Sequence, residues 1–359
     1  MKGSAMGNPP IIDRKTAVEK INKLIANLNT VIKDKEEVIR LTLAGFLARG
    51  HILYDDIPGT GKSILAESLA RSVSAGESGI AVFKRIQGTP DLMPGDVTGI
   101  SIYNPETKEF EPKLGPIATG NIVLDDELNR TPPKVNSAVL EAMSRETVTI
   151  DGVSYNVPKP YLVIATQNPI EQEGTFVLPE ALLDRFMLRL SLGYPSKEAE
   201  LEILASQRNH HPIHDLRPVI SCDEILHIQQ ALTINPSEDG FIYMHRLIEE
   251  YIVAIIDATR KEVAKEKSER MLDYGASTRG TLALRDAARA YAFMNDRDYV
   301  IPQDIRALAV PVLAHRVGVN MRVVRSGNEN RTAEEAIKRI VASVATPSEQ
   351  NWTEPQIKF

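Results

Sequence analysis

Residues 55–63 place glycine, lysine and serine at the spacing of a phosphate-binding loop, in the order Asp-Asp-Ile-Pro-Gly-Thr-Gly-Lys-Ser. The glycines let the backbone turn its N–H groups inward around an anion, and the helix that follows adds its positive end. Lys62 can reach the β- and γ-phosphates of a nucleotide, and the Ser63 hydroxyl can ligate Mg²⁺. The alternative is an ordinary glycine-rich turn, since Asp56 stands where the usual pattern has glycine. The residues expected to bind the nucleotide are Asp56, Pro58, Gly59, Thr60, Gly61, Lys62, Ser63 and Ile64.

A second apolar run, residues 122–124, leads into Asp125, Asp126 and Glu127. A strand end places these acids at the carboxyl edge of a parallel sheet, where the phosphate loop also lies. Asp126 can hold Mg²⁺ through water, with Ser63 as the other metal-binding residue. Glu127 can polarise the water that attacks a γ-phosphate. The alternative is a solvated acidic loop.

Two further side chains follow apolar runs. Asn168 comes after residues 161–166, and its amide can orient the attacking water, although asparagine before proline is also a turn signal. Arg185 lies between residues that look buried, so its charge needs an anionic partner. A γ-phosphate on a neighbouring subunit would serve as that partner, and so would an acid of the same chain.

Arg279 lies in the first turn of a helix expected over 279–294. A cation at this end opposes the helix dipole, which suggests a nearby anion. Exposed arginines also tolerate such positions, so the residue alone does not establish a binding site.

The elements that must position these groups follow from the apolar spacing. Buried strands are expected near 51–54, 80–86, 121–125, 161–165 and 186–190, with helices over 14–50 and between the strands. This alternation implies an α/β fold, with a parallel sheet covered by helices on both faces. Hairpins are expected near 98–112 and 147–158, the second around the turn Asp151-Gly152.

From Pro195 onward the strand signal disappears, which predicts a second, all-helical domain. Its helices are expected near 196–208, 222–232, 241–268, 279–294, 302–316 and 333–344. The domain organisation is therefore a disordered N-terminus with an expression remnant (1–13), an α/β nucleotide-binding domain (14–193), a helical lid (194–346) and a loose tail (347–359).

The bulk composition limits the kinds of partner and the compartment that we expect for the protein. A net charge of −6 and 5% aromatic residues argue against nucleic acid as the main partner, because such binding needs clustered cations and stacking platforms. The single cysteine, Cys222, excludes an internal disulfide and suits a reducing compartment. No signal peptide and no apolar run of about 20 residues is evident. The expected location is the cytoplasm, with no membrane span.

The phosphate loop, the strand-end acids, Asn168, Arg185 and Arg279 follow one another in an order that resembles AAA+ ATPases. The longer sequence motifs around them resemble the MoxR family, in the clade with a helix-2 insert. The similarity covers about residues 15–345. The segments that carry it are Gln87–Gly99, Asp126–Lys134, Leu140–Met143, Ala165–Thr175 and Leu178–Phe186.

The resemblance implies a role for each matching residue. Lys62 and Ser63 correspond to Walker A and Asp126 and Glu127 to Walker B; Asn168 corresponds to sensor 1, Arg185 to the arginine finger and Arg279 to sensor 2. The hairpin segments correspond to the helix-2 insert and the pre-sensor-1 hairpin. Asp56 is common in this branch. Asp125 is a departure, since a small residue is usual there, and it can alter Mg²⁺ affinity.

The leading hypothesis is a Mg²⁺-dependent ATPase that binds ATP and ADP and forms a ring, expected to be a hexamer because Arg185 serves hydrolysis only when a neighbour presents it. The resemblance implies chaperone-like remodelling or maturation of protein complexes, with a partner that carries a von Willebrand factor A domain on a separate chain. Two alternatives are a nucleotide-gated assembly scaffold with little turnover and a nucleic-acid motor. The sequence names no client, and it does not decide whether Arg279 contacts the nucleotide of its own subunit or of the neighbour.

Overall fold

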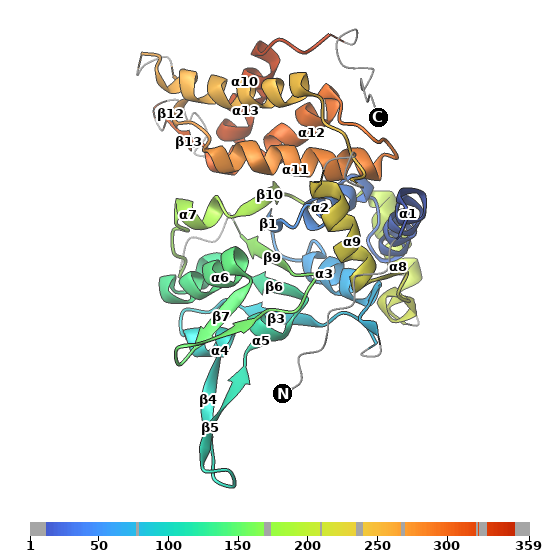
Figure 1. Ribbon diagram of the computed structural model, residues 1–359, viewed down its shortest axis with the longest axis vertical. Coiled ribbons are helices and arrows are strands. Elements are labelled where there is room, and N and C mark those ends of the chain that lie inside the picture. The colour runs from blue at the N-terminus through green and yellow to red at the C-terminus, as the bar shows by residue number, and fades with distance from the viewer. Residues whose placement is uncertain are drawn as a thin grey trace. The chain divides into compact units, whose positions relative to one another are not determined.

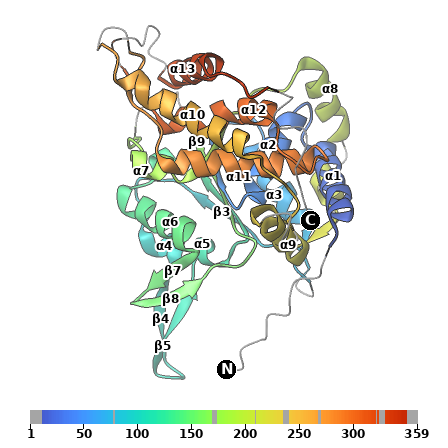
Figure 2. The ribbon, with the colours of Figure 1, turned by 45° about the horizontal axis from the view of Figure 1, so that its top comes forward.

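The computed structural model describes residues 12–76, 79–168, 174–208, 210–234, 240–266, 270–320, 322 and 329–348. The chain divides into two compact units (Figures 1 and 2). The first comprises Met1–Thr42, His51–Arg185 and Leu190–Ile228, and the second comprises Leu43–Gly50, Phe186–Arg189 and Gln229–Phe359. Most of the expected N-terminal segment (1–11) and of the tail (349–359) lies outside the described residues. The domain boundary at 193/194 stays a prediction.

A parallel sheet forms the centre of the first unit. Its strands lie in the order β1-β9-β6-β3, which are His51–Asp55, Leu162–Gln167, Ile122–Asp126 and Phe83–Gln87. All three pairings are parallel. The inner strands are almost wholly buried because helices cover both faces of such a sheet. These strands, and β10 (Phe186–Leu190), confirm the predicted α/β pattern to within three residues.

Two groups of helices pack on this sheet. In Figure 1, α1 and α3 lie on one side of it and α4, α5 and α6 on the other. Their bounds are α1 Arg14–Val31, α3 Lys62–Arg71, α4 Pro94–Thr98, α5 Pro116–Thr119 and α6 Pro133–Arg145. The α1 helix begins where the Asp13 side chain accepts a hydrogen bond from Thr16 N at 3.0 Å, and its face of Val18, Ile21, Leu24, Ile25 and Leu28 is buried.

Two hairpins interrupt the α/β alternation at the expected places. Strands β4 (Gly99–Asn104) and β5 (Glu109–Leu114) form a hairpin that projects from the unit in Figure 1 and exposes side chains on both faces. Strands β7 (Thr147–Ile150) and β8 (Val153–Asn156) turn at Asp151-Gly152, both with positive φ, as an Asp-Gly hairpin requires. Unlike β4–β5, this hairpin buries Val148 and Ile150.

The second unit is built mainly from helices, as the sequence predicts. They are α10 Arg246–Val263, α11 Thr278–Met294, α12 Pro302–Leu313 and α13 Glu329–Ser343. Buried aliphatic side chains on α10, α11 and α12, such as Ile255, Leu284 and Leu308, form its core. The predicted helix over 241–268 is shorter than expected, and residues 267–269 lie outside the described part.

The remaining elements include strands that the sequence analysis missed. Three of them, β11 (Ile220–Ser221), β12 (Leu272–Tyr274) and β13 (Gly318–Val319), lie in connections between the expected helices, in the part of the chain that was expected to be all-helical. Segments of two or three residues are too short to show the alternation that predicts a strand. The other elements are α2 Glu36–Leu47, β2 Val73–Ser74, α7 Glu180–Leu183, α8 Lys197–Ser206 and α9 Cys222–Thr233. None of the described helices combines the length and apolarity needed to cross a membrane.

Candidate active site

The loop between β1 and α3 has the backbone that the sequence predicts. Gly59 and Gly61 adopt φ of 81° and 94°, a left-handed region that disfavours other residues. Gly61 is the N-cap of α3 and leaves no side chain at the helix end. The first N–H groups of α3 therefore face the space above the loop, where an anion gains from both the hydrogen bonds and the helix dipole.

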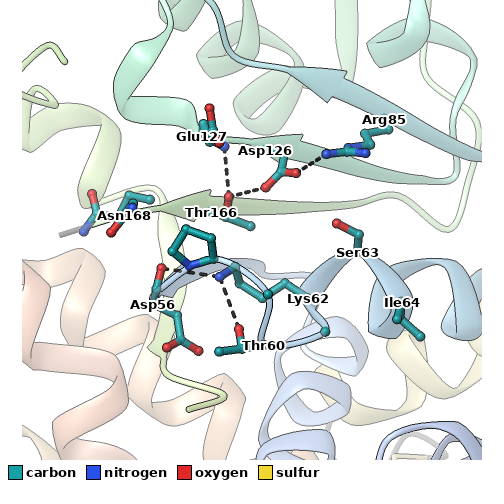
Figure 3. Close-up of a pocket in the computed structure, with 14 residues that line it drawn as sticks. Asp56, Thr60, Lys62, Ser63, Ile64, Arg85, Asp126, Glu127, Thr166 and Asn168 are labelled. Atoms are coloured by element: carbon teal, nitrogen blue, oxygen red, sulfur yellow. Dashed lines mark hydrogen bonds and ion pairs between the residues drawn. The ribbon is translucent and has the colours of Figure 1, made fainter. Parts of the chain in front are cut away.

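Lys62 is the first residue of α3, and its ammonium group turns back into the loop (Figure 3). Its Nζ donates to Ile57 O at 2.6 Å and to Asp56 O and Thr60 Oγ1 at 3.3 Å. All three acceptors are neutral, although the side chain is only 7% exposed. Burial lowers the pKa of Lys62, and the nearby carboxylates act in the opposite direction. A buried cation held only by neutral oxygens suits an incoming anion.

Asp56 occupies the first position of the loop, and its carboxylate accepts hydrogen bonds from the protein backbone. One oxygen accepts from Leu192 N and Gly193 N, both at 2.8 Å, and the other accepts from Ile57 N at 3.0 Å. The side chain is 6% exposed. Asp56 therefore fixes the loop to the residues after β10, which gives a physical reason for an acid where glycine is usual.

Asp126 ends β6 and is held from two sides (Figure 3). Its Oδ1 accepts from Thr166 Oγ1 at 2.6 Å, and its Oδ2 accepts from Arg85 at 2.6 Å. Thr166 lies on β9 and Arg85 on β3, the two strands that flank β6. Neither partner was predicted from the sequence.

Glu127 follows β6 in a left-handed conformation, with φ of 60°. A residue other than glycine in this region is strained, and such strain is common at functional sites. Its backbone N–H donates to Thr166 Oγ1 at 2.9 Å, and its carboxylate accepts from Arg130 at 3.0 Å. Gly88 allows this turn, because a Cβ there would lie 2.2 Å from Glu127 O.

These groups share one cavity of about 360 Å³. All eight loop residues that the sequence predicts line it, as do Asp126, Glu127 and Asn168. Asn168 follows β9 and is 8% exposed. Three lining residues were not predicted, namely Arg85, Thr166 and Gln167. The volume falls within the range of small-molecule sites.

A second cavity, of about 630 Å³, lies between the end of α1, the start of α2 and residues near Glu202. Ile32 and Leu192 line it, and they are also the side chains nearest to Gly61, where a Cβ would lie 3.9 and 3.8 Å from them. The phosphate loop therefore has an apolar wall beside it, which the sequence analysis did not foresee.

The two predicted arginines do not line the phosphate cavity. Arg185 belongs to the first unit, after α7, and it is partly buried. Within the described part of the chain its guanidinium has no hydrogen bond or ion pair, and its role in a neighbouring site stays a prediction. Arg279 belongs to the second unit, where it is exposed in the first turn of α11.

Asp125 lies fully buried on the opposite face of β6 from Asp126, because side chains alternate along a strand. Neither of its carboxyl oxygens has a hydrogen-bond partner among the described residues. Burial, and secondarily the charge of Asp126, raises the pKa of Asp125 to about 7. The sequence predicts this charge beside the metal-binding acids, but the side chain points away from them into the core.

The donor set fits a nucleotide with Mg²⁺. A buried ammonium, two left-handed glycines and a helix N-terminus suit phosphate, while a serine hydroxyl and a carboxylate are the hard oxygen ligands that Mg²⁺ prefers. Over the described ranges, no group of three or more His, Cys, Asp or Glu side chains could hold a metal ion by protein ligands alone.

A strand–loop–helix around a buried lysine, beside a strand that ends in acids, defines a P-loop nucleotide-binding protein. Comparisons with known proteins agree. Residues 51–188 match the "ATPase family associated with various cellular activities (AAA)", and residues 264–340 match the "AAA lid domain".

Two sequence relatives span nearly the whole chain. YeaC of Bacillus subtilis, an uncharacterized protein, is 43% identical over 92% of this chain and 96% of its own length. Chaperone MoxR1 of Mycobacterium tuberculosis is 36% identical over 92% of this chain and 83% of its own length. The crystal structure of a candidate ATPase from Cytophaga hutchinsonii is also similar, with 36% identity, a TM-score of 0.80, and coverage of 93% of this chain and 97% of that one. The chain belongs to the MoxR family of AAA+ ATPases.

Proposed function

We propose that this protein hydrolyses ATP in a Mg²⁺-dependent reaction and works as a ring-forming, chaperone-like remodeller of protein complexes. The observation that carries the proposal is the single cavity in which Lys62, Asp126, Glu127 and Asn168 meet the phosphate loop. Phosphoryl transfer to water needs little from a protein beyond positioning and charge stabilisation, and these groups supply both.

Each residue takes a role from its position. Lys62 and the first N–H groups of α3 bind the phosphates, and Ser63 and Asp126 hold Mg²⁺. The ion, when bound, neutralises charge that develops on the phosphate oxygens. Glu127 accepts a proton from the attacking water, and Asn168 orients that water. Arg130 must release the Glu127 carboxylate first, because their 3.0 Å hydrogen bond occupies one of its two oxygens.

The nucleoside is proposed to occupy the second cavity. Its apolar wall, formed by Ile32 and Leu192, adjoins Gly61. An apolar surface beside the phosphate loop suits a planar base. Lys33, Asp34 and Lys35 line the same cavity and offer polar partners to the base or ribose.

Ring formation is proposed from Arg185. Its guanidinium is partly buried and has no partner among the described residues, so its donors are open to an anion from outside the subunit. The γ-phosphate of a neighbouring subunit would be such an anion, so Arg185 is proposed to complete the neighbour's site in a hexamer. Arg279 is proposed to sense the nucleotide from the lid, in its own subunit or in the neighbour's.

The remodelling role rests on the family. A relative carries the name chaperone MoxR1. The proposed partner carries a von Willebrand factor A domain on a separate chain, and the projecting β4–β5 hairpin, with Phe110 72% exposed, is a candidate contact for a protein client.

Phosphate release by the purified protein tests the chemistry. Wild type should release phosphate only with Mg²⁺ present, and Glu127→Gln should bind ATP with wild-type affinity while its rate falls by about 10²-fold or more. Glu67→Gln, on α3 but outside the set of residues that line the cavity, is the matched control and should keep the wild-type rate. A wild-type rate for Glu127→Gln would overturn the assignment.

Mixed assemblies test whether Arg185 acts on a neighbour. Lys62→Ala removes the phosphate site, and Arg185→Ala removes the donated cation, so each variant alone should lose about 10³-fold in rate. If Arg185 acts between subunits, mixing the two variants pairs an intact site with an intact arginine and restores part of the activity. A mixture as inactive as its components, at concentrations where light scattering shows assembly, would contradict the ring proposal.

A further inference from the structure

The phosphate cavity contains a second cation that the proposed chemistry does not use. Arg85 lies on β3 and lines the same cavity as Lys62. In the pairing of β3 with β6, Arg85 stands beside Leu124 and Gln87 beside Asp126. Side chains two positions apart share a face of a sheet, so Arg85, Gln87 and Asp126 all face the phosphate loop.

The Arg85 guanidinium has two specific partners. Its Nη2 donates to Asp126 Oδ2 and to Gln87 Oε1, both at 2.6 Å. The Arg85 side chain is 51% exposed, whereas that of Asp126 is only 15% exposed. The guanidinium can therefore move into the cavity at little cost, while the carboxylate stays fixed between β3 and β9.

Both oxygens of the Asp126 carboxylate therefore accept a hydrogen bond from the protein. Thr166 Oγ1 donates to Oδ1, and Arg85 donates to Oδ2 (Figure 3). The threonine is neutral and β9 holds it in place, but the arginine carries a full charge. A divalent cation bound near Asp126 would lie close to this guanidinium, and like charges at short range in a partly buried site repel each other.

We infer that Arg85 is a positioning residue of the phosphate site, which neutralises Asp126 before Mg²⁺ binds and then transfers its hydrogen bonds to the terminal phosphate of the nucleotide. The inference rests on the proposed function. It gives Arg85 two opposite effects: the residue competes with Mg²⁺ for Asp126, and it adds affinity for the phosphate.

Nucleotide binding at controlled Mg²⁺ tests this pair of effects. The probes are fluorescent methylanthraniloyl derivatives of ATP and ADP, titrated into the full-length protein with EDTA and then at increasing Mg²⁺. Arg85→Gln should weaken ATP binding in EDTA by about tenfold, as expected for one lost hydrogen bond to a charged group, and should weaken ADP binding less. The same variant should lower the Mg²⁺ concentration for half-maximal stimulation of ATP binding by at least about threefold.

Two further variants sharpen the result. Arg85→Lys keeps the charge and should hold the Mg²⁺ midpoint near that of wild type. Arg71→Gln, which breaks an ion pair with Glu67 on α3, is the matched control and should change neither affinity. The thermal unfolding temperature of Arg85→Gln should stay within a few degrees of wild type, because the side chain is half exposed.

The outcomes separate this inference from the proposed function. If wild type binds the probes and Arg85→Gln matches Arg71→Gln in both affinity and Mg²⁺ midpoint, the Arg85 inference is wrong and the proposed function stands. Weaker ATP binding together with a higher Mg²⁺ midpoint would also overturn it, because a general loss of structure predicts that result. Failure of wild type to bind either probe would overturn both.

Discussion

The two faces of the central sheet place their acidic side chains in different surroundings. On the face toward the phosphate loop, Asp126 accepts hydrogen bonds from Arg85 and Thr166, so its charge is compensated. On the other face, Asp125 is fully buried without a hydrogen-bond partner among the described residues. His51 faces the same side, and its ring accepts from Val163 N and contacts Met143 O.

This difference separates groups that serve chemistry from groups that affect only stability. On the loop-facing side, Asp126 and Glu127 line the cavity and are accessible to a ligand. On the other side, burial disfavours charge, and it holds the pKa of Asp125 near 7 and that of His51 near 4. Substitutions on the first face should change binding, and substitutions on the second should change the free energy of unfolding.

The largest effect is expected on the loop-facing side. Lys62→Ala should weaken ATP binding by about 10³-fold, because it removes the buried cation that the phosphates would contact. The free energy of unfolding should change much less than the binding energy, since the lysine donates only to neutral acceptors. Calorimetric titration with ATP beside a urea titration measures both quantities. A large loss of stability with unchanged ATP affinity would break the comparison.

Asp125→Ala should produce the opposite result, a stability gain of about 3 kcal/mol at pH 8. The Asp125 carboxyl has a native pKa near 7 and an ordinary value of 3.8, so the unfolded chain ionises at lower pH than the folded protein. The wild-type protein therefore loses about 4 kcal/mol of its free energy of unfolding as pH rises from 3.8 to 7. Alanine removes that loss, but the small cavity that it leaves costs about 1 kcal/mol. Urea titration at pH 8 measures the gain, with the exposed Glu106→Ala as control. Destabilisation by Asp125→Ala would show that the carboxyl has a partner.

A smaller effect is expected from His51, and it depends on pH. The native pKa near 4 lies below the ordinary 6.5, so between these values the unfolded chain takes up a proton that the folded chain does not. Stability should therefore fall as pH drops, by about 2 kcal/mol between pH 8 and pH 5. His51→Gln should remove that part of the pH dependence, and the exposed His214→Gln should not. Equal pH slopes for wild type and His51→Gln would show that His51 is protonated in the folded protein.

Much of the site was predictable because its signals are local. The loop glycines, Lys62 and Ser63 follow one strand directly, and Asp126 and Glu127 follow another. The carboxyl ends of parallel strands share an edge of the sheet, which is enough to bring these groups together. The strands and the Asp151-Gly152 turn were visible for the same reason.

The partners of Asp126 were not predictable, because they depend on strand order. Arg85 and Thr166 reach Asp126 only because β3 and β9 flank β6, although they lie 41 and 40 residues from it in the chain. To predict the orientation of Asp125, one must also know which residues of β6 face which side of the sheet. Consecutive residues of a strand face opposite sides, so Asp125 and Asp126 could have been assigned to different faces.

The bonds of Asp56 to Leu192 and Gly193 have a mechanical consequence. A glycine at position 56 would lack these bonds, although the backbone N–H of that residue would still donate to Gln167 O, as the Asp56 N–H does at 3.1 Å. The Asp56 carboxylate ties the loop to a second segment, so the loop cannot shift without stretching two charge-assisted hydrogen bonds. The loop therefore loses conformational freedom, and the shape of the phosphate-binding site is fixed before a ligand binds.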